Sequence, residues 1–85
     1  RMNTLALVGE AEADYAALRR DAAPDDVLPE LLLLSRLEEL GARSAMAAPL
    51  AAAQEKRPRD PRILEALSRF EQLLRTADPG GARQP

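Results

Sequence analysis

The chain has 85 residues, with 12 basic and 14 acidic side chains, a formal net charge of −2, and neither cysteine nor histidine. Its length leaves room for one domain, and the missing residue types exclude disulfides, thiolate or imidazole metal sites and histidine general bases. Because this charge offers no field that would attract nucleic acid or an anionic membrane, we expect neither partner.

Leu and Ala dominate the apolar residues, which make up 46% of the chain, and the only β-branched apolar residues are Val8, Val27 and Ile63. This composition favours helices over strands and predicts an all-α fold. No apolar run reaches the roughly 18 residues of a membrane span, and the N-terminus lacks a signal-peptide pattern. We expect a cytoplasmic protein with a single helical domain over residues 1–77 and a disordered tail over residues 78–85.

The first predicted helix runs from about residue 4 to residue 22, with Asn3 or Thr4 as its N-cap. Gly9 in its interior costs about 1 kcal/mol relative to Ala, and Pro24 closes the helix. Its apolar residues recur at spacings of three and four, as expected for one buried helix face. This stripe comprises Val8, Ala11, Tyr15 and Leu18.

A second helix is predicted over residues 27–40. Asp25 and Asp26 supply N-cap oxygens, and Pro29 falls in the first turn, where its missing N–H does no harm. Gly41 follows at the C′ position, which favours a residue that accepts a left-handed backbone. The second helix should therefore end at residue 40.

The third predicted helix extends to about residue 57, but its start has two solutions. Ser44 is a suitable cap, and a helix beginning at Ala45 would be kinked at Pro49. If the helix begins near Ala48 instead, Pro49 lies in the first turn and does no harm. The pattern does not choose between these starts.

A fourth helix is predicted from residue 61 to about residue 76, because Asp60 is a suitable N-cap and Pro61 a suitable first helical residue. Short connections between the four helices favour antiparallel neighbours. The core stripe of this last helix comprises Ile63, Leu67, Phe70 and Leu74.

Residues 31–40, LLLLSRLEEL, recur thirty-three residues later as LEALSRFEQL, with six of ten positions identical. A period near 33 or 34 residues built from two helices is typical of tetratricopeptide repeats, and residues 27–76 resemble that family. The resemblance implies antiparallel helical hairpins, with Glu30 and Ile63 standing where the family favours tryptophan. The implied core positions are Leu33, Leu37, Leu40, Ala45 or Met46, Leu50, Ala53, Ala66, Phe70 and Leu73, with Pro58 closing the first repeat.

In that family the first helix of each repeat lines a concave groove that binds a partner. Such a groove would be apolar at one end and mildly acidic at the other here, which suits an amphipathic helix with Leu or Ile anchors and some Lys or Arg. The resemblance places there Leu28, Leu31, Ser35 and Glu38 from the first copy and Pro61, Leu64, Ser68 and Glu71 from the second. Leu28, Leu31, Leu32 and Ser35 stand where basic residues would clamp a C-terminal acidic peptide, so we do not expect that ligand.

The four leucines of residues 31–34 cover all sides of a helix, so one face cannot hold them all. Either this helix is buried on every side, or part of it faces a partner. A repeat-like unit has one hydrophobic face that it cannot bury alone, and about two units are present, which favours a second molecule.

Other polar groups indicate surface or core rather than chemistry. Ser35 and Ser68 have no histidine to activate them, and Glu38 and Glu39 point different ways on a helix. We expect no catalytic residue, no cofactor, no metal and no small-molecule substrate, and therefore no enzyme. Tyr15 and Phe70 are expected in the core, and a solvated loop rather than a nucleic-acid site is expected for Lys56, Arg57, Arg59 and Arg62.

These patterns favour a small interaction module, an adaptor or a chaperone, that binds an amphipathic helix of a partner protein. The chain is similar to the small tetratricopeptide-like chaperones that hold needle subunits of bacterial type III secretion systems. Some of these end with a helix opened by Asp-Pro-Arg-Ile, as at residues 60–63 here. The alternative is a structural helical homo-oligomer, in which residues 27–40 of two copies pack together without a client.

Overall fold

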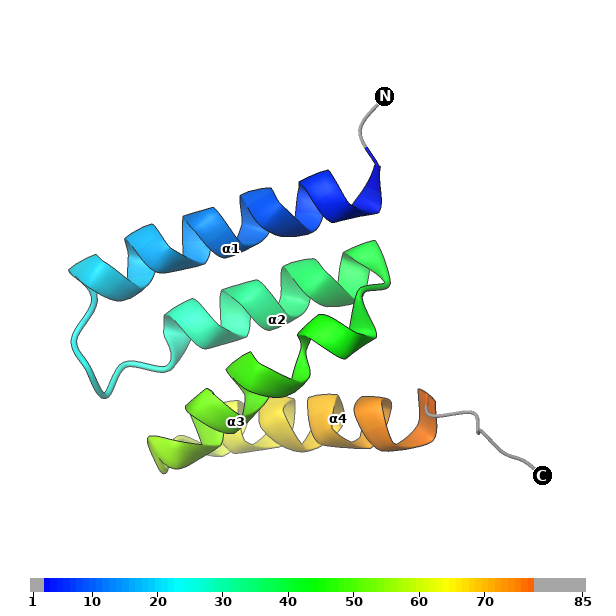
Figure 1. Cartoon of the computed structure of the whole chain (residues 1–85). Coiled ribbons are helices and arrows are strands. Elements are labelled where there is room, and N and C mark those ends of the chain that lie inside the picture. Colours follow the sequence, from blue (N-terminus) through cyan, green and yellow to red (C-terminus); the bar gives the residue numbers. More distant parts are fainter. Residues whose placement is uncertain (1–2, 78–85) are drawn as a thin grey trace.

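The computed structural model describes residues 3–77, in which helices are the only regular secondary structure (Figure 1). The all-α prediction is confirmed for this range, and the tail predicted over residues 78–85 lies outside it. The elements are α1 (Thr4–Asp21), α2 (Leu28–Leu40), the 3₁₀ helix η1 (Arg43–Ala45), α3 (Ala47–Glu55) and α4 (Pro61–Ala77).

Helices α1 and α4 begin directly after the predicted caps Asn3 and Asp60, and α2 begins two residues after Asp26, with Val27 as its N-cap residue. In each case a side-chain oxygen accepts a backbone N–H that would otherwise have no partner in the first turn. The N–H groups of Ala6, Leu28 and Arg62 donate to Oδ1 of Asn3, Asp26 and Asp60 over 2.8, 2.9 and 2.9 Å, respectively.

Helix α2 ends at Gly41, as predicted, in a left-handed conformation with φ of 72°. The N–H groups of Gly41 and Ala42 donate to the carbonyls of Glu38 and Leu37 over 3.0 and 2.9 Å. These bonds satisfy two carbonyls that have no partner within the helix. A side chain is strained in this backbone conformation, which explains the glycine.

The third helix begins late. Helix α3 starts at Ala47 and Pro49 lies in its first turn, so the prediction of a start near Ala48 is confirmed and the kinked alternative is wrong. Ser44 belongs to η1 and makes no capping bond, contrary to its predicted role. Because Pro49 cannot lie in the interior of an α-helix, the residues before α3 form this short 3₁₀ turn instead.

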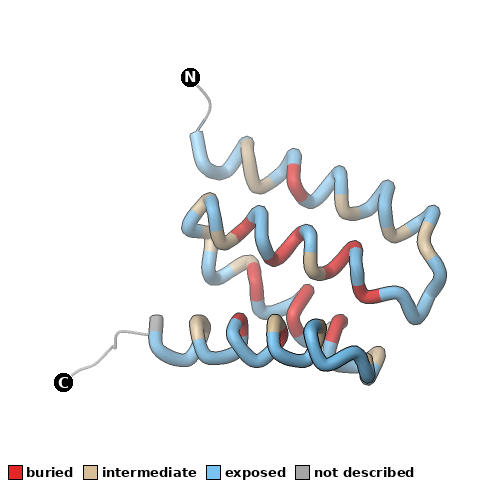
Figure 2. The backbone as a smooth tube through the Cα atoms, turned by 180° about the vertical axis from the view of Figure 1, so that it is seen from behind, coloured by how far each residue is buried: buried red, intermediate tan, exposed pale blue. Residues whose placement is uncertain are grey.

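Each helix packs on the next in chain order, α1 on α2, α2 on α3 and α3 on α4 (Figure 1). Buried positions cluster where these helices meet (Figure 2). The core comprises Ala11, Leu33, Leu34, Leu37, Met46, Leu50, Ala53, Leu67 and Phe70, with Tyr15 partly buried against it.

The four consecutive leucines are divided between core and surface. Leu33 and Leu34 are buried, Leu31 is half-buried against the core, and Leu32 is 50% exposed. Helix α2 is therefore not buried on every side, and only one of its four consecutive leucines, Leu32, is largely exposed to solvent.

The described chain is an extended slab rather than a sphere. Its extents are 44 × 35 × 16 Å and its radius of gyration is 13.6 Å, against about 11 Å for a compact chain of this length. Among residues 3–77, no helix is both long and apolar enough to cross a membrane. A slab leaves a large fraction of its side chains on the surface.

Candidate functional site

Several leucines remain on the surface of this slab. Single exposed apolar residues are normal in folded proteins, so only their grouping is informative. The exposed fractions are 82% for Leu5, 42% for Leu18, 54% for Leu28, 50% for Leu32 and 47% for Leu64.

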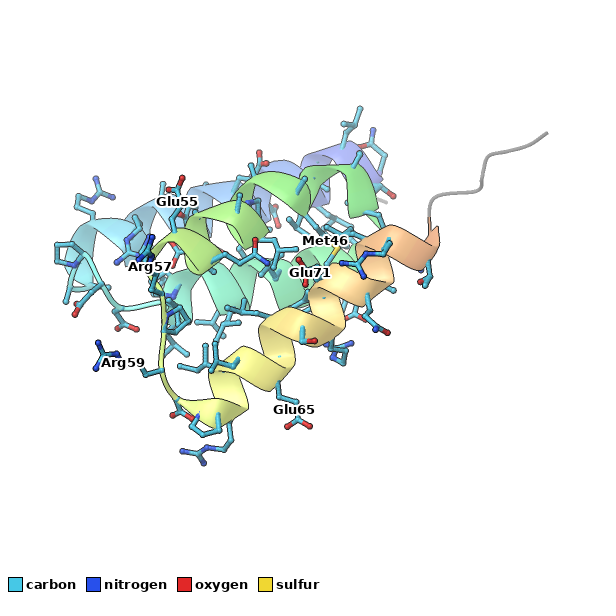
Figure 3. All side chains as sticks on the ribbon, turned by 90° about the horizontal axis from the view of Figure 1, so that it is seen from below. Met46, Glu55, Arg57, Arg59, Glu65 and Glu71 are labelled. Carbon is cyan, nitrogen blue, oxygen red and sulfur yellow. The ribbon has the colours of Figure 1, made fainter. Side chains whose placement is uncertain are left out.

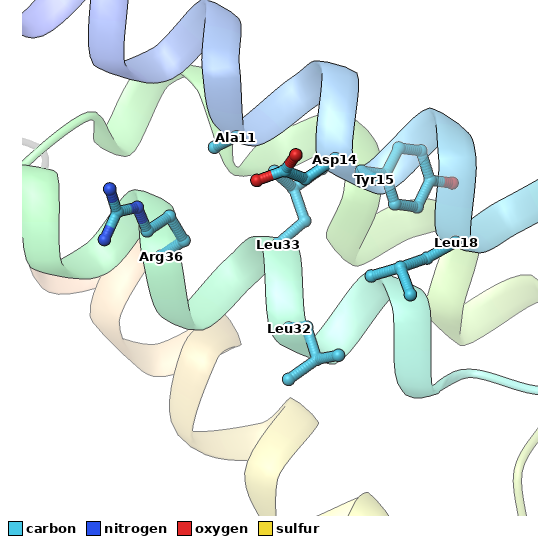
Figure 4. Close-up of a pocket in the computed structure, with 7 residues that line it drawn as sticks. All are labelled: Ala11, Asp14, Tyr15, Leu18, Leu32, Leu33 and Arg36. Atoms are coloured by element: carbon cyan, nitrogen blue, oxygen red, sulfur yellow. The ribbon is translucent and has the colours of Figure 1, made fainter.

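Three of these leucines lie together. Leu18, from the last part of α1, and Leu28 and Leu32, from the first part of α2, line one cleft with Pro29. An adjoining cleft, also lined by Leu18 and Leu32, continues along the two helices towards Arg36 (Figure 4). We call the surface formed by Leu18, Leu28 and Leu32 the leucine cleft.

The predicted stripe on α1 is wrong at Leu18. Ala11 is buried and Tyr15 is half-buried, as predicted, but the next residue on this inner face is Arg19 rather than Leu18. Residues four apart lie on one helix face, and Ala11, Tyr15 and Arg19 have this spacing. The Arg19 side chain points towards the helix interface because it pairs with a buried carboxylate, and Leu18, on the neighbouring side of α1, lines the leucine cleft.

That carboxylate belongs to Glu30, whose side chain is completely buried. Arg19 Nη1 lies 2.7 and 2.8 Å from its two oxygens, and the Tyr15 hydroxyl donates to Oε2 over 2.7 Å. Lys56 Nζ, just after α3, lies 3.6 Å from the same oxygen. We call these four residues the ion cluster.

The ion cluster keeps Glu30 ionised. Burial alone raises the pKa of a carboxyl group, but the hydrogen bonds from Arg19 and Tyr15 outweigh it and lower the pKa of Glu30. Burial and the bond to this carboxylate raise the pKa of Tyr15. A carboxylate held in this way is structural: it ties α1 and the end of α3 to α2 and fixes the two walls of the leucine cleft.

The residues of the basic cluster that was predicted as a solvated loop differ in their exposure. Arg57 and Arg59 are exposed in the connection between α3 and α4 (Figure 3). Lys56 is half-buried, because its ammonium group reaches the buried Glu30. The prediction is therefore wrong for Lys56.

The two predicted groove carboxylates face different neighbours. Glu38 pairs with Arg69 of α4 through two contacts of 3.1 Å, and the hydrogen bonds from Arg69 lower the pKa of Glu38. Glu71 instead accepts a hydrogen bond from Gln54 Nε2 of α3 over 3.4 Å. The copies of the repeated segment are thus not equivalent in their surroundings.

The structure brings together part of the predicted groove and adds a residue to it. Leu28 and Leu32 share the leucine cleft, whereas Leu31 packs against the core and Leu64 is exposed on α4. The remaining predicted groove residues, Ser35, Pro61 and Ser68, are exposed.

Sequence reasoning missed Leu18 in the site and missed the ion cluster. Two signals point to the cluster: Tyr15 and Arg19 are four residues apart, and Glu30 stands in a leucine-rich helix where the resembled family favours tryptophan.

Comparison of the chain with protein-family models, curated proteins and solved structures finds no match.

Proposed function

We propose that this chain is a protein-interaction module that binds an amphipathic helix of another protein at the leucine cleft. The observation that carries this proposal is the gathering of three half-exposed leucines, from two helices, on one concave surface. Helix-in-groove recognition uses apolar anchors spaced at i, i+3, i+4 and i+7 on the bound helix.

Covering the leucine cleft contributes a modest amount of binding free energy. Burying a fully exposed leucine is worth about 1.5–3 kcal/mol, so covering half of each side chain contributes about 1 kcal/mol. Three leucines together contribute about 3 kcal/mol, or roughly a hundredfold in affinity. Anchors on the partner add a similar amount, and the lost freedom of the two molecules offsets much of this total, so the three leucines alone would support only a weak, transient complex.

The more specific form of this proposal is an adaptor or chaperone with tetratricopeptide-like helical hairpins, of the kind that holds needle subunits of type III secretion systems. The repeated segment, carried by α2 and α4, supports it. So does the Asp-Pro-Arg-Ile opening of α4, in which Asp60 accepts the N–H of Arg62. In this role the chain would shield an apolar helix until that helix assembles elsewhere.

A structural homo-oligomer is the second candidate. It is favoured by Leu5 and Leu64, which are exposed on α1 and α4 outside the leucine cleft. Light scattering separates the two candidates. A stable, folded dimer that binds no other protein supports the homo-oligomer, whereas a chain that becomes ordered only with a co-expressed protein supports the helix-binding module.

Leu32→Asp and Leu5→Asp are a matched pair of variants, one in the leucine cleft and one outside it. Both replace an exposed leucine on a helix, and Leu5 lies about 20 Å along α1 from Leu18, by the rise of an α-helix. Proteins captured by the wild-type chain are identified by mass spectrometry, purified and titrated against each variant by calorimetry.

We expect Leu32→Asp to lose at least tenfold in affinity for the identified protein and Leu5→Asp to bind as the wild type does. Far-ultraviolet circular dichroism checks that both variants are folded. Equal affinities for the two variants would show that the leucine cleft is not the binding surface.

A further inference from the structure

The rim of the leucine cleft is acidic. Asp21 and Asp26 line the cleft beside Leu18 and Leu28, and Asp14 lines its continuation beside Leu32. Arg36, at the far end of the continuation, is the basic residue among the lining side chains. Three carboxylates against one guanidinium leave this surface with a net negative charge.

These three carboxylates take no part in the ion pairs of the described residues. Among residues 3–77, the ion pairs within 4.0 Å involve Glu30, Glu38, Glu39, Asp60 and Glu71, and none involves Asp14, Asp21 or Asp26. Asp26 accepts the N–H of Leu28, the first residue of α2, through one oxygen. Asp14 and Asp21 are exposed, and within residues 3–77 their carboxylates form no hydrogen bond or ion pair, so they are open to a binding partner.

The carboxylate of Asp21 also lies where it destabilises helix α1. It lies in the last turn of α1, where the helix dipole is negative and a carboxylate is unfavourable. The carbonyl groups at the end of α1 do not stabilise the carboxylate of Asp21. A cation bound in the cleft, in contrast, would be attracted both by Asp21 and by this end of α1.

From this charge and from the cleft geometry we infer that the helix bound at the leucine cleft is cationic, with Leu-sized anchors flanked by Lys or Arg. This inference rests on the proposed function and names the partner class. Asp14, Leu18 and Asp21 follow at i, i+4 and i+7 on one side of α1 and span about 10 Å. The partner therefore needs its basic residues about two turns apart, on the side of its apolar stripe that faces α1.

A second copy of this chain fits the cleft less well. In α4, whose apolar residues are concentrated on one face, Leu67 and Phe70 are already buried in the core. Of its leucines, Leu64 alone is more than one-third exposed, and the acidic Glu65 follows it. That helix offers the cleft a single anchor, so another protein is the better occupant.

Two synthetic peptides of about 15 residues, or four helical turns, test the inference. Both carry Leu at i, i+3, i+4 and i+7; one carries Lys at the flanking positions and the other carries Glu. Binding of each labelled peptide is measured by fluorescence anisotropy against the full chain. We expect the Lys peptide to bind at least about fivefold more tightly at low salt, because exposed ion pairs each contribute a modest amount, and the ratio to shrink at about 0.5 M salt.

A charge-reversal variant and a matched control locate the effect. Asp14→Lys with Asp21→Lys should abolish or reverse the preference for the Lys peptide. Glu55→Lys with Glu65→Lys makes the same change in net charge on α3 and α4, away from the cleft, and should keep the preference (Figure 3). An equal loss in both double variants would mean that net charge alone decides.

The outcomes separate this inference from the proposed function. If the Glu peptide binds as tightly as the Lys peptide and Leu32→Asp weakens both, the cleft binds helices but the cationic partner is wrong. If neither peptide binds, or if the chain forms a dimer that closes the cleft to both, the proposed function fails and this inference fails with it.

Discussion

Glu30 is the residue on which the arrangement of α1 and α2 depends. Its carboxylate is completely buried and is surrounded by Tyr15 and Arg19 from α1 and by Lys56 from just after α3. Removing one member of a buried ionic group leaves the others without a counter-charge, which costs more than the group contributed as a whole.

Glu30→Gln should therefore destabilise the fold. The amide keeps the size of the side chain but removes its charge, leaving Arg19 and Lys56 partly buried and unpaired. We expect the free energy of unfolding to fall by about 2 kcal/mol, less than for fully buried cations because both retain some exposure. Urea denaturation measures this change.

Glu39→Gln is the control for that variant. Glu39 lies on the same helix with its side chain 72% exposed and its nearest cation 3.9 Å away. A change below about 0.5 kcal/mol is expected for such a surface site. Similar losses in the two variants would show that the ion cluster has no special role.

Acid should weaken the wild type more than Glu30→Gln. The pKa of Glu30 is lowered, so the folded chain takes up this proton less readily than the unfolded chain, whose glutamates titrate at about 4.3. The stabilisation is present above that pH and is lost as the pH falls through the lowered pKa. Glu38 titrates in both proteins and cancels in the comparison.

The free energy of unfolding of the wild type should therefore decline more steeply than that of Glu30→Gln between about pH 5 and pH 3. Urea titrations at several pH values measure the two slopes. Parallel slopes would mean that Glu30 is not held ionised by its neighbours.

The leucines of α2 offer a second comparison at single residues. Leu34 is completely buried, and Leu34→Ala should cost about 3 kcal/mol through lost burial and the cavity left behind. Leu32 is half exposed, and Leu32→Ala should cost less than about 1 kcal/mol. Thermal and urea unfolding measure both, and equal losses would contradict the described placement of Leu32.

Residue roles were predictable only where a local rule fixes them. The side-chain oxygens of Asn3, Asp26 and Asp60 accept backbone N–H groups within three residues, and the prediction named all three residues. Glu30 and Leu18 depend on which side chains meet after α1 has docked on α2, and no periodicity in one helix carries that information.

At the scale of elements, the two described glycines have opposite effects. Gly41 ends α2 at positive φ, whereas Gly9 lies inside α1, where an added Cβ meets nothing within 4 Å. Gly41→Ala should destabilise the fold by about 1 kcal/mol, and Gly9→Ala should stabilise it by up to about 1 kcal/mol. Thermal denaturation of the pair measures both signs, and destabilisation by Gly9→Ala would contradict the described α1.

Helix bounds were largely predictable because proline, glycine and capping residues mark them. The start of α3 was the exception, since the sequence allows two positions relative to Pro49. The structure adds η1 between α2 and α3, a short 3₁₀ turn of the kind that often connects helices, which contacts both of its neighbours.

At the scale of the whole molecule, the extended slab explains why leucines stay exposed. A radius of gyration of 13.6 Å exceeds that of a compact chain of this length, so fewer apolar side chains share one core. The repeated leucine-rich segment predicted uncovered apolar surface. It did not predict that the surface would be formed by α1 together with α2, because that depends on how the helices pack.

The occupancy of the leucine cleft is tested most directly by leucine-methyl NMR of the labelled wild-type chain during titration with the Lys peptide. We expect the methyl resonances of Leu18, Leu28 and Leu32 to shift together and saturably, while those of Leu5 stay unchanged. Shifts at Leu5 as large as those in the cleft, or no shift at any of the three, would contradict the assignment of this surface as a helix-binding site.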